Sequence, residues 1–277
     1  MTDEAVTGKR AAVIVTTYNR PDALQAVLEG FREQDTHDFE LLVADDGSTD
    51  ETRHVVEACA RGAPHPVRHV WQEDEGFRAG AARNRALAQT NAGYVIFTDG
   101  DCVPPPFFVS RHLELAQPGY FLAANRLLLS EAFTREVLAR RMPIHRWGAP
   151  QWLAAWAKRD VNRALPLAHL PDWAFRVKQP ARWEGVKTCN LSAWRSDLAR
   201  VNGFDERYSG WGLEDSDLVI RLLHAGVKHK SARFAAPVFH LWHRENDRSR
   251  LLDNRRKLDE ILASQRTEAM VGLDRYA

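Results

Sequence analysis

The first half of the chain alternates short apolar runs with longer amphipathic segments, and this alternation constrains the fold more than any other feature. Runs rich in β-branched and aromatic residues predict buried strands, and the segments between them have helical spacing. The predicted strands are 11–17, 39–44, 67–72 and 94–98, and the predicted helices are 22–34, 50–60 and 80–92. We therefore expect an α/β fold, with a mostly parallel, Rossmann-like sheet and helices on both faces.

Polar residues gather where three of these strands end. The residues concerned are 17–20, 45–48 and 99–101. In open parallel sheets, ligands bind beyond the carboxyl ends of the strands. The sequence therefore predicts a nucleotide-type pocket at this edge of the sheet.

Composition excludes several classes of protein. The formal net charge of +1 over 277 residues gives no global argument for nucleic-acid binding. No apolar run approaches the roughly 18 residues that suggest a membrane span, and residues 1–9 lack the apolar core of a signal peptide. Cys59, Cys102 and Cys189 have no metal-type spacing, which fits a reducing compartment, so we expect a cytoplasmic protein.

We expect one domain over residues 1–277. Its predicted parts are a nucleotide-sugar-binding half (9–125), an insertion (126–186), an acceptor and catalytic half (187–245) and a C-terminal helix (246–277). In the catalytic half, the pattern predicts strands at 187–194 and 235–242 and a helix at 214–225.

The insertion differs from the rest of the chain in composition. Residues 126–187 hold five of the nine tryptophans, and twelve Lys and Arg against five Asp and Glu, a net charge of +7. We expect a mostly helical insertion that supplies the acceptor side of the pocket. Its charge favours an anionic or lipid-linked acceptor and peripheral contact with the inner face of the cytoplasmic membrane. The alternative is a small tryptophan core with solvated arginines.

The sequence Asp99-Gly100-Asp101 predicts a cation site. Two carboxylates separated by glycine in a tight turn can share a hard divalent ion, although a plain Asp-Gly turn is the alternative. His240 and His243 follow the last predicted strand, and imidazole suits Mn2+ beside a carboxylate. Because residues three apart on a strand point to opposite faces, we expect only one histidine, His240, to bind Mn2+ (or Mg2+) with Asp101.

The segment 45–48 follows the second strand and carries two adjacent acids. A carboxylate here can accept the imide N–H of uracil, and Thr16 and Tyr18 leave the neighbouring strand, where Tyr18 can stack on the base. The alternative is a turn in which Ser48 or Asp50 caps the next helix. Both interpretations can hold, because one acid, Asp46, is enough for the base.

Arg83 lies near the start of the third predicted helix, at the same edge. A guanidinium beside free helix amides suits a diphosphate, and the alternative is a solvated surface arginine. Farther along, Gly210–Asp217 places Trp211 and the adjacent acids Glu214 and Asp215 before a helix. The indole can support the apolar face of a sugar and a carboxylate can take a hydroxyl proton, whereas the alternative is capping of that helix.

Together these motifs resemble the inverting glycosyltransferases of family 2, which have the GT-A fold. The matching stretches are 13–20, 45–50, 82–84, 97–102, 190–206 and 210–223. The second half resembles the carboxyl-terminal galactosyltransferase-type region shared by animal β-1,4-galactosyltransferases and bacterial chondroitin polymerases. The resemblance covers about two thirds of the chain, in order, and leaves out 126–183.

The resemblance implies transfer of a hexose or N-acetylhexosamine from a UDP-sugar to a saccharide or lipid-linked acceptor, as in bacterial surface polysaccharide or lipopolysaccharide synthesis. It implies these roles: Thr16, Tyr18, Arg20 and Asp46 at the nucleotide, Asp99 at the ribose or diphosphate, Asp101 and His240 at the metal, Glu214 at a sugar hydroxyl, Asp215 as general base, and Trp211 and Asn190 at the sugars. Ser216 interrupts the run of acids, so Asp217 is expected only to cap the helix.

Two other classes of protein could share the predicted sheet and nucleotide pocket. A sugar-nucleotide pyrophosphorylase should have a glycine-rich loop after the first strand, where this chain has residues 16–20. A non-catalytic nucleotide-sugar-binding subunit should have lost the base, whereas Glu214 and Asp215 are both present.

Overall fold

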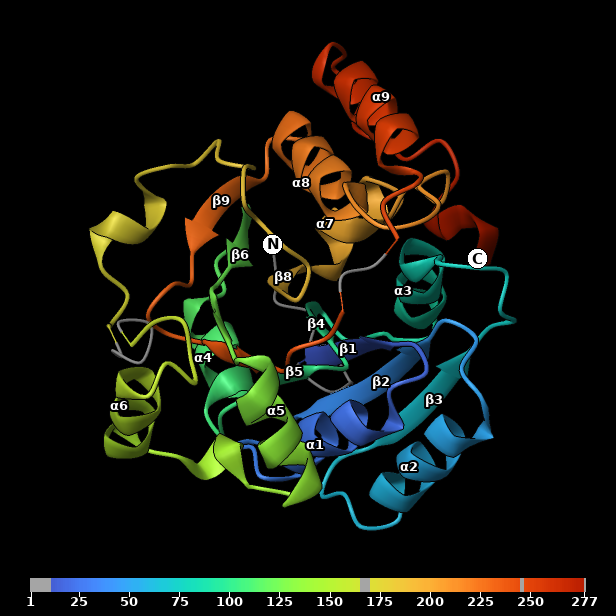
Figure 1. Ribbon diagram of the computed structural model, residues 1–277. Helices are drawn as coiled ribbons and strands as arrows, with labels where there is room; N and C mark the ends of the chain where they lie inside the picture. The colour runs from blue at the N-terminus through green and yellow to red at the C-terminus, as the bar shows by residue number, and fades with distance from the viewer. Residues whose placement is uncertain (1–10, 165–169, 245–246, 277) are drawn as a thin grey trace.

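The computed structural model describes residues 11–164, 170–244 and 247–276, and it contains a seven-stranded sheet with helices on both faces (Figure 1). The strand order is β3-β2-β1-β4-β8-β6-β9. These strands are β1 (Ala11–Thr17), β2 (Phe39–Asp45), β3 (Val67–Trp71), β4 (Tyr94–Asp99), β6 (Tyr120–Ala123), β8 (Asn190–Trp194) and β9 (Lys228–Ser231). Strand β8 runs antiparallel to both of its neighbours and the other pairs are parallel. The expected α/β fold is confirmed.

The two faces of the sheet hold separate hydrophobic clusters. Because side chains alternate along a strand, Val13 and Val15 of β1 pack on one face, with α1, α2 and α4, while Ala12 and Ile14 pack on the other, with α3, α7 and α8. These helices are α1 (Pro21–Arg32), α2 (Asp50–Ala60), α3 (Ala79–Ala88), α4 (Phe108–Leu115), α7 (Arg195–Arg200) and α8 (Glu214–His224).

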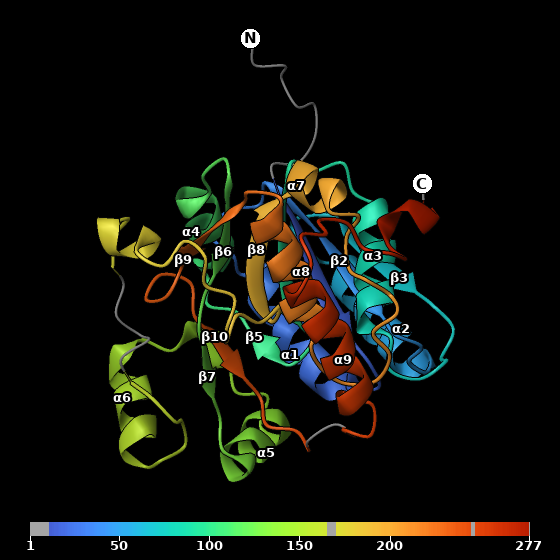
Figure 2. The same ribbon diagram turned by 90° about the horizontal axis from the view of Figure 1, so that it is seen from above.

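A second, three-stranded sheet joins distant parts of the chain. Strand β10 (Val238–His240) lies between β5 (Cys102–Val103) and β7 (Arg126–Leu128). In this sheet His240 pairs with Cys102, the residue after the second acid of the Asp-Gly-Asp turn. The small sheet therefore brings the predicted histidines close to the predicted cation site. Figure 2 shows β5 and β10 next to each other near the centre of the molecule.

The strand ends meet at one edge, as the alternation predicts. Thr17 pairs with Asp45, and Thr16 pairs with Asp99. The next strand begins at the same edge, because Thr98 pairs with Asn190. The polar segments after β1, β2 and β4 therefore share one end of the sheet.

The prediction of a mostly helical insertion was wrong. In the described part of residues 126–187, the α-helices are α5 (Glu131–Ala139) and α6 (Ala149–Ala157); a short 3-10 helix, η1 (Ile144–Arg146), lies between them, and another, η3 (Ala174–Val177), follows α6. Pro171, Pro180 and Gly185 lie in the irregular remainder, where proline and glycine oppose continued helix. Part of the predicted tryptophan core exists, since Trp152 is 1% exposed and stacks on Phe239 with ring centroids 4.0 Å apart.

Strand β9 was missed because its sequence, Lys-His-Lys-Ser, has no apolar run. Its Lys230 is nevertheless buried, with Nζ donating to Asp172 Oδ2 (2.7 Å) and Gln117 Oε1 (3.1 Å). Helix α9 (Leu251–Leu262) follows in the predicted C-terminal segment. Across the described ranges, no helix has the length and apolar character needed to cross a membrane.

Candidate active site

One buried arginine joins three elements at the carboxyl edge of the sheet. Arg83, from the second turn of α3, donates from Nε to Thr16 Oγ1 (2.9 Å). Its two terminal nitrogens reach Asp99 Oδ1 (3.1 Å) and Glu214 Oε1 (3.3 Å). Arg83 is only 4% exposed, so it is not the solvated surface residue of the alternative interpretation. The guanidinium instead holds β1, β4 and α8 together.

Burial and Arg83 have opposite effects on the pKa values of the two acids that pair with this arginine, Asp99 and Glu214. Burial raises the pKa of Glu214, and the neighbouring Asp215 raises it further, while Arg83 opposes both. The pKa of Asp99 is likewise raised by its enclosure, against the effect of Arg83, with Asp101 adding to the rise. Each carboxylate therefore depends on the guanidinium for its charge.

The two acids after β2 have different partners. Asp45 is fully buried and accepts from Ser48 N (2.8 Å) and from His69 Nε2 (2.7 Å), which builds the turn. Asp46 accepts from the amide of Gln72 (2.7 Å) and from the backbone N–H of Arg78 (2.7 Å). Burial raises the pKa of Asp46 to about 6. Both hydrogen bonds to Asp46 therefore come from neutral groups, a side-chain amide and a backbone N–H.

The segment after β1 is anchored to the same turn. Asn19 has a positive φ of 47°. Its Oδ1 accepts a hydrogen bond from the backbone N–H of Thr49, and its own backbone N–H donates to Ser48 Oγ. The predicted capping by Ser48 or Asp50 was wrong: Thr49 occupies the N-cap of α2 without a side-chain cap, and Ser48 Oγ is used by Asn19.

Tyr18 and Arg20 flank this anchor. Tyr18 is 47% exposed, and its hydroxyl donates to Asp74 Oδ2 (2.9 Å), so its ring is accessible just beyond the carboxyl end of β1. Arg20 pairs with Asp22 at 3.0 Å, in the first turn of α1. The pairing leaves Arg20 one third exposed.

His240, at the end of β10, and His243, just beyond it, both point at Asp101. His240 Nε2 lies 3.7 Å from Asp101 Oδ1, and His243 Nε2 lies 3.4 Å from Asp101 Oδ2. The expectation that the two rings face opposite sides was wrong, because β10 ends at His240 and the chain leaves the strand geometry there. One carboxylate and two imidazoles therefore converge.

This donor set fits a divalent cation. The pKa of His240 is lowered by burial, and the neutral imidazole is the form that ligates metal. Cys102 also lies within this cluster, but burial raises the pKa of its thiol well above the usual range, so it stays protonated and donates to Asp101 Oδ1 (3.4 Å). Carboxylate and imidazole without thiolate suit Mn2+ better than a soft ion.

The acids of α8 follow a backbone reversal. Gly210, Gly212 and Leu213 have φ angles of 71°, 106° and 75°, so a leucine occupies the left-handed region directly before the helix. Such a conformation costs a non-glycine residue about 1–3 kcal/mol. Helix α8 then begins at Glu214 without any side-chain cap.

The three acids in the first turn of α8 have three different partners. Glu214 pairs with Arg83, as described above. Asp215 lies 3.4 Å from Lys187 Nζ and accepts from Ser216 N (2.8 Å). Lys187 was missed by the sequence reasoning, since nothing in its local pattern distinguishes it from other basic residues of the insertion.

Asp217 does not cap the helix as expected. It forms a buried ion pair with Arg221 at 2.7 Å, and the two side chains are 1% and 0% exposed. Arg221 also donates to the carbonyls of Val201 and Gly203. Asp217 therefore fastens α8 to the loop before it.

Asn190 and Trp211 differ in their surroundings. Asn190 is 1% exposed, its Nδ2 donates to the carbonyls of Asn125 and Ala236, and its Oδ1 lies 3.0 Å from His112 Nε2. Asn190 therefore lies in the core, with both ends of its amide used in hydrogen bonds inside the protein. Trp211 is half-buried, with the guanidinium of Arg248 5.1 Å from its ring centroid.

Asn84 is a further residue whose role the sequence did not reveal. Its Nδ2 donates to Phe204 O (2.8 Å) and Glu206 Oε1 (2.9 Å), and its Oδ1 accepts from Phe204 N (2.8 Å). It thereby fixes the loop that leads to α8 against α3, the helix that carries Arg83.

Two family models and several curated proteins match this chain. The family model described as "Glycosyl transferase family 2" matches residues 12–172, and that described as "N-terminal domain of galactosyltransferase" matches residues 173–244. Validoxylamine A glucosyltransferase of Streptomyces hygroscopicus subsp. jinggangensis is 32% identical over 78% of this chain and 52% of its own length. Chondroitin synthase of Escherichia coli is 23% identical, over 81% of this chain and 34% of its own length. The chain thus spans about half or less of these relatives.

Solved structures share the fold. Staphylococcus aureus TarS 1-349 in complex with UDP superposes with a TM-score of 0.60 at 16% identity, covering 96% of this chain and 68% of that one. The mannosyltransferase PcManGT of Pyrobaculum calidifontis, in complex with GDP-Man and Mn2+, has a TM-score of 0.63 at 20% identity, covering 93% of this chain and 64% of that one. At these identities the likeness establishes the GT-A fold alone.

Proposed function

The chain belongs to glycosyltransferase family 2, and from that premise we propose that it moves a hexose or N-acetylhexosamine from a UDP-sugar to a hydroxyl of a saccharide or lipid-linked acceptor, with inversion. The observation that carries the proposal is the Arg83 network, which joins Asp99 on the nucleotide side to Glu214 beside Asp215. Relatives named chondroitin synthase and hyaluronan synthase favour a role in polysaccharide assembly.

The donor end favours a uracil nucleotide. Asp46 would accept the imide N–H, because its existing hydrogen bonds leave acceptor capacity on both oxygens. Thr16 and the exposed ring of Tyr18 lie at the end of the adjacent strand and would contact the nucleoside, with Arg20 close by. TarS has been solved with UDP, which supports this choice of nucleotide.

Asp101, His240 and His243 would hold a divalent cation, Mn2+ or Mg2+. When bound, such an ion supplies charge neutralisation for a departing diphosphate. The Mn2+ complexes of PcManGT and of glucosyl-3-phosphoglycerate synthase from Mycobacterium tuberculosis support this assignment. Asp99 would contact the ribose or diphosphate edge, and Arg83 would keep Asp99 in place while adding positive charge there.

Asp215 would act as the general base on the acceptor hydroxyl. Its Oδ1 is fixed by Ser216 N and its Oδ2 faces Lys187, so the carboxylate is held in one orientation. Glu214, held by Arg83, would bind a hydroxyl of a sugar, and Trp211 would support the sugar's apolar face. Proton removal by a carboxylate opposite the leaving group gives a single in-line displacement, hence a β-linked product from an α-linked donor.

A second proposal concerns the insertion. Leu153 and Trp156 of α6 are each 50% exposed, and the exposed Lys158 and Arg159 follow at the end of that helix; Trp173, also in the insertion, is 57% exposed. Exposed tryptophan and leucine beside basic residues suit the interface of an anionic membrane. Sedimentation with phosphatidylglycerol vesicles should carry the chain down and should fail for Trp156→Ser; an unbound wild type would exclude the membrane role.

The donor can be identified by titrating UDP-glucose, UDP-galactose and their N-acetylamino counterparts. We expect one of them to raise the melting temperature and to release UDP when turned over. Release should stop in EDTA and return with Mn2+. Stabilisation without turnover would favour a non-catalytic binding subunit, and absence of any UDP-sugar binding would overturn the proposal.

A further inference from the structure

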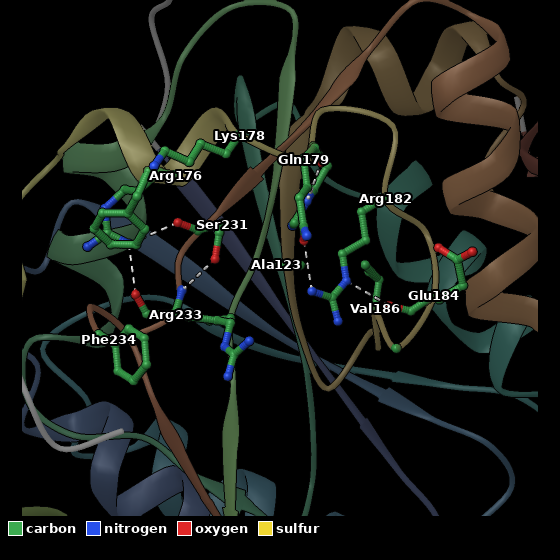
Figure 3. A pocket seen from close by; sticks show the side chains of 14 residues that line it. Ala123, Arg176, Lys178, Gln179, Arg182, Glu184, Val186, Ser231, Arg233 and Phe234 are labelled. Carbon is green, nitrogen blue, oxygen red and sulfur yellow. Dashed lines mark hydrogen bonds between the residues drawn. The ribbon is translucent and has the colours of Figure 1, made fainter. Parts of the chain in front are cut away.

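A basic pocket of about 280 Å3 opens beside the catalytic half, away from the Arg83 network. Its wall is made by η3, the loop that follows it, and residues of strands β6 and β9. In Figure 3, Arg182 and Gln179 stand on one side of Ala123, and Ser231, Arg233 and Lys178 stand on the other. Such a volume exceeds that of a single ion, since one water occupies about 30 Å3 of liquid.

One of the pocket's arginines is part of its frame. Arg176 is 1% exposed and donates to the carbonyls of Leu170, Pro171, Ser231 and Arg233. These bonds tie η3 to the end of β9 and shape the wall. Arg176 is therefore occupied, and any ligand must be held by other residues.

Three exposed cations remain on this wall: Lys178, Arg182 and Arg233. Arg182 donates to Glu184 O (3.1 Å) and Gln179 Oε1 (3.0 Å), both of which are neutral acceptors. Within residues 11–164, 170–244 and 247–276, none of the three forms an ion pair. Glu184 is the single acid of the lining, so the pocket carries an uncompensated positive charge.

The pocket wall and the proposed base share one segment of chain. Glu184, Gly185 and Val186 line the pocket, and the next residue, Lys187, places its Nζ 3.4 Å from Asp215 Oδ2. A molecule bound among the three cations therefore abuts the segment that contacts the base. An acceptor that reaches Asp215 along this segment would pass the pocket.

We propose that this pocket binds a phosphate ester carried by the acceptor, so that the acceptor is a phosphorylated saccharide or glycerol unit; the inference rests on the proposed transferase function. Phosphate suits the site because it carries about −1.5 to −2 charges at neutral pH, more than one carboxylate. Arg182 and Arg233 can each present paired N–H groups to its oxygens. The remaining volume accommodates the group to which the phosphate is attached.

The test uses the full chain with saturating UDP and Mn2+, so that the donor site is filled. Glycerol 3-phosphate, inorganic phosphate and glycerol are titrated separately by isothermal calorimetry. We expect glycerol 3-phosphate to bind and glycerol not to bind. Arg182→Gln and Arg233→Gln should each weaken binding at least about tenfold, the value of a lost charged hydrogen bond. Arg135→Gln, a control at a helix surface site 76% exposed, should leave it unchanged.

Three results would overturn the proposal that this pocket binds a phosphate ester. These are no binding of glycerol 3-phosphate, equal loss in the Arg135→Gln control, or loss of the ester's binding when UDP is added. If inorganic phosphate binds as tightly as glycerol 3-phosphate, the pocket recognises the phosphate ion alone, and the proposal of a phosphorylated acceptor is excluded. A separate titration with UDP alone distinguishes the proposed donor from the proposed acceptor. Binding of UDP without binding of glycerol 3-phosphate would exclude the phosphorylated acceptor only. Binding of glycerol 3-phosphate without binding of UDP would exclude the UDP-sugar donor.

Discussion

The acids of the site fall into two groups that differ in their partners. Asp217 is held by the guanidinium of Arg221, and Asp99 and Glu214 share that of Arg83; both arginines are buried. Asp101 and Asp215 instead face groups that can move or lose charge, the two imidazoles and the half-exposed ammonium of Lys187. The first group is fixed in position by a buried guanidinium, whereas the second group faces partners that a ligand can displace, although members of the two groups are one or two residues apart in the sequence.

The difference explains why neighbouring carboxylates in one motif should respond differently to the same substitution. Removing a guanidinium-paired acid leaves a buried positive charge, which costs stability. Removing an acid of the second group leaves a group that can become neutral or solvated. Substitution of single acids from each group tests this division.

Asp215→Asn should lower transfer by about 10²–10⁴-fold, because the amide cannot accept the proton of the acceptor hydroxyl. Unfolding free energy and UDP affinity should stay near those of the wild type, since Lys187 is 43% exposed and can be solvated. Steady-state release of UDP with acceptor measures the rate. Near-normal transfer would remove Asp215 from the role of base.

Asp217→Asn should reduce the free energy of unfolding by about 3–5 kcal/mol, because it leaves Arg221 buried without a counter-charge. Urea denaturation followed by circular dichroism measures this. The matched control is Asp259→Asn in α9, whose pair with Arg255 is more than half exposed and should change stability by less than about 0.5 kcal/mol. Equal effects in both variants would contradict the division.

Asp101→Asn should weaken Mn2+ binding at least about tenfold, since it removes the carboxylate that two histidines face. Asp99→Asn should weaken it less, because that acid is paired with Arg83. Free Mn2+ measured by electron paramagnetic resonance during titration gives both affinities. If the two variants lose the same affinity, the two acids of the Asp-Gly-Asp turn share the ion equally and the assignment fails.

Uridine binding should fall by about tenfold between pH 7 and pH 5, because the pKa of Asp46 is about 6. The sign follows from the chemistry: above pH 6 the carboxylate accepts the imide N–H, and below it the protonated form offers a donor instead. Uridine is used because it lacks the titrating phosphate of UDP. Asp46→Asn should bind weakly at both pH values; a wild-type affinity that stays constant would exclude Asp46 as the acceptor.

The sequence was most informative where local pattern decides structure. Strands β1, β2 and β4 are continuous apolar runs, so their ends, and hence the positions of Asp46, Asp99 and Asp101, could be predicted within a residue or two. The family match to residues 12–172 confirms the identification that these motifs supported. Strand β9 escaped prediction because its buried lysine is stabilised by partners more than fifty residues away in the sequence.

Partners across the fold could not be predicted for the same reason. Arg83 meets Glu214 across 131 residues, and Asn84 meets Phe204 across 120. Asn190 matched a family motif, yet its place between β4 and β6 puts its amide in the core. A motif records which residues occur together, whereas burial depends on what the rest of the chain packs over them.

The reversal at Gly210–Leu213 fixes the phase of α8. Three of the four residues before the helix, Gly210, Gly212 and Leu213, have positive φ angles, and the helix begins directly after them. One inserted or deleted residue would turn the helix by about 100°, moving Glu214 off Arg83 and Asp215 off Lys187 together. Related chains that keep this site should therefore keep the number of residues in the turn, even where its composition varies. The length of the turn sets the direction in which the acids of α8 point.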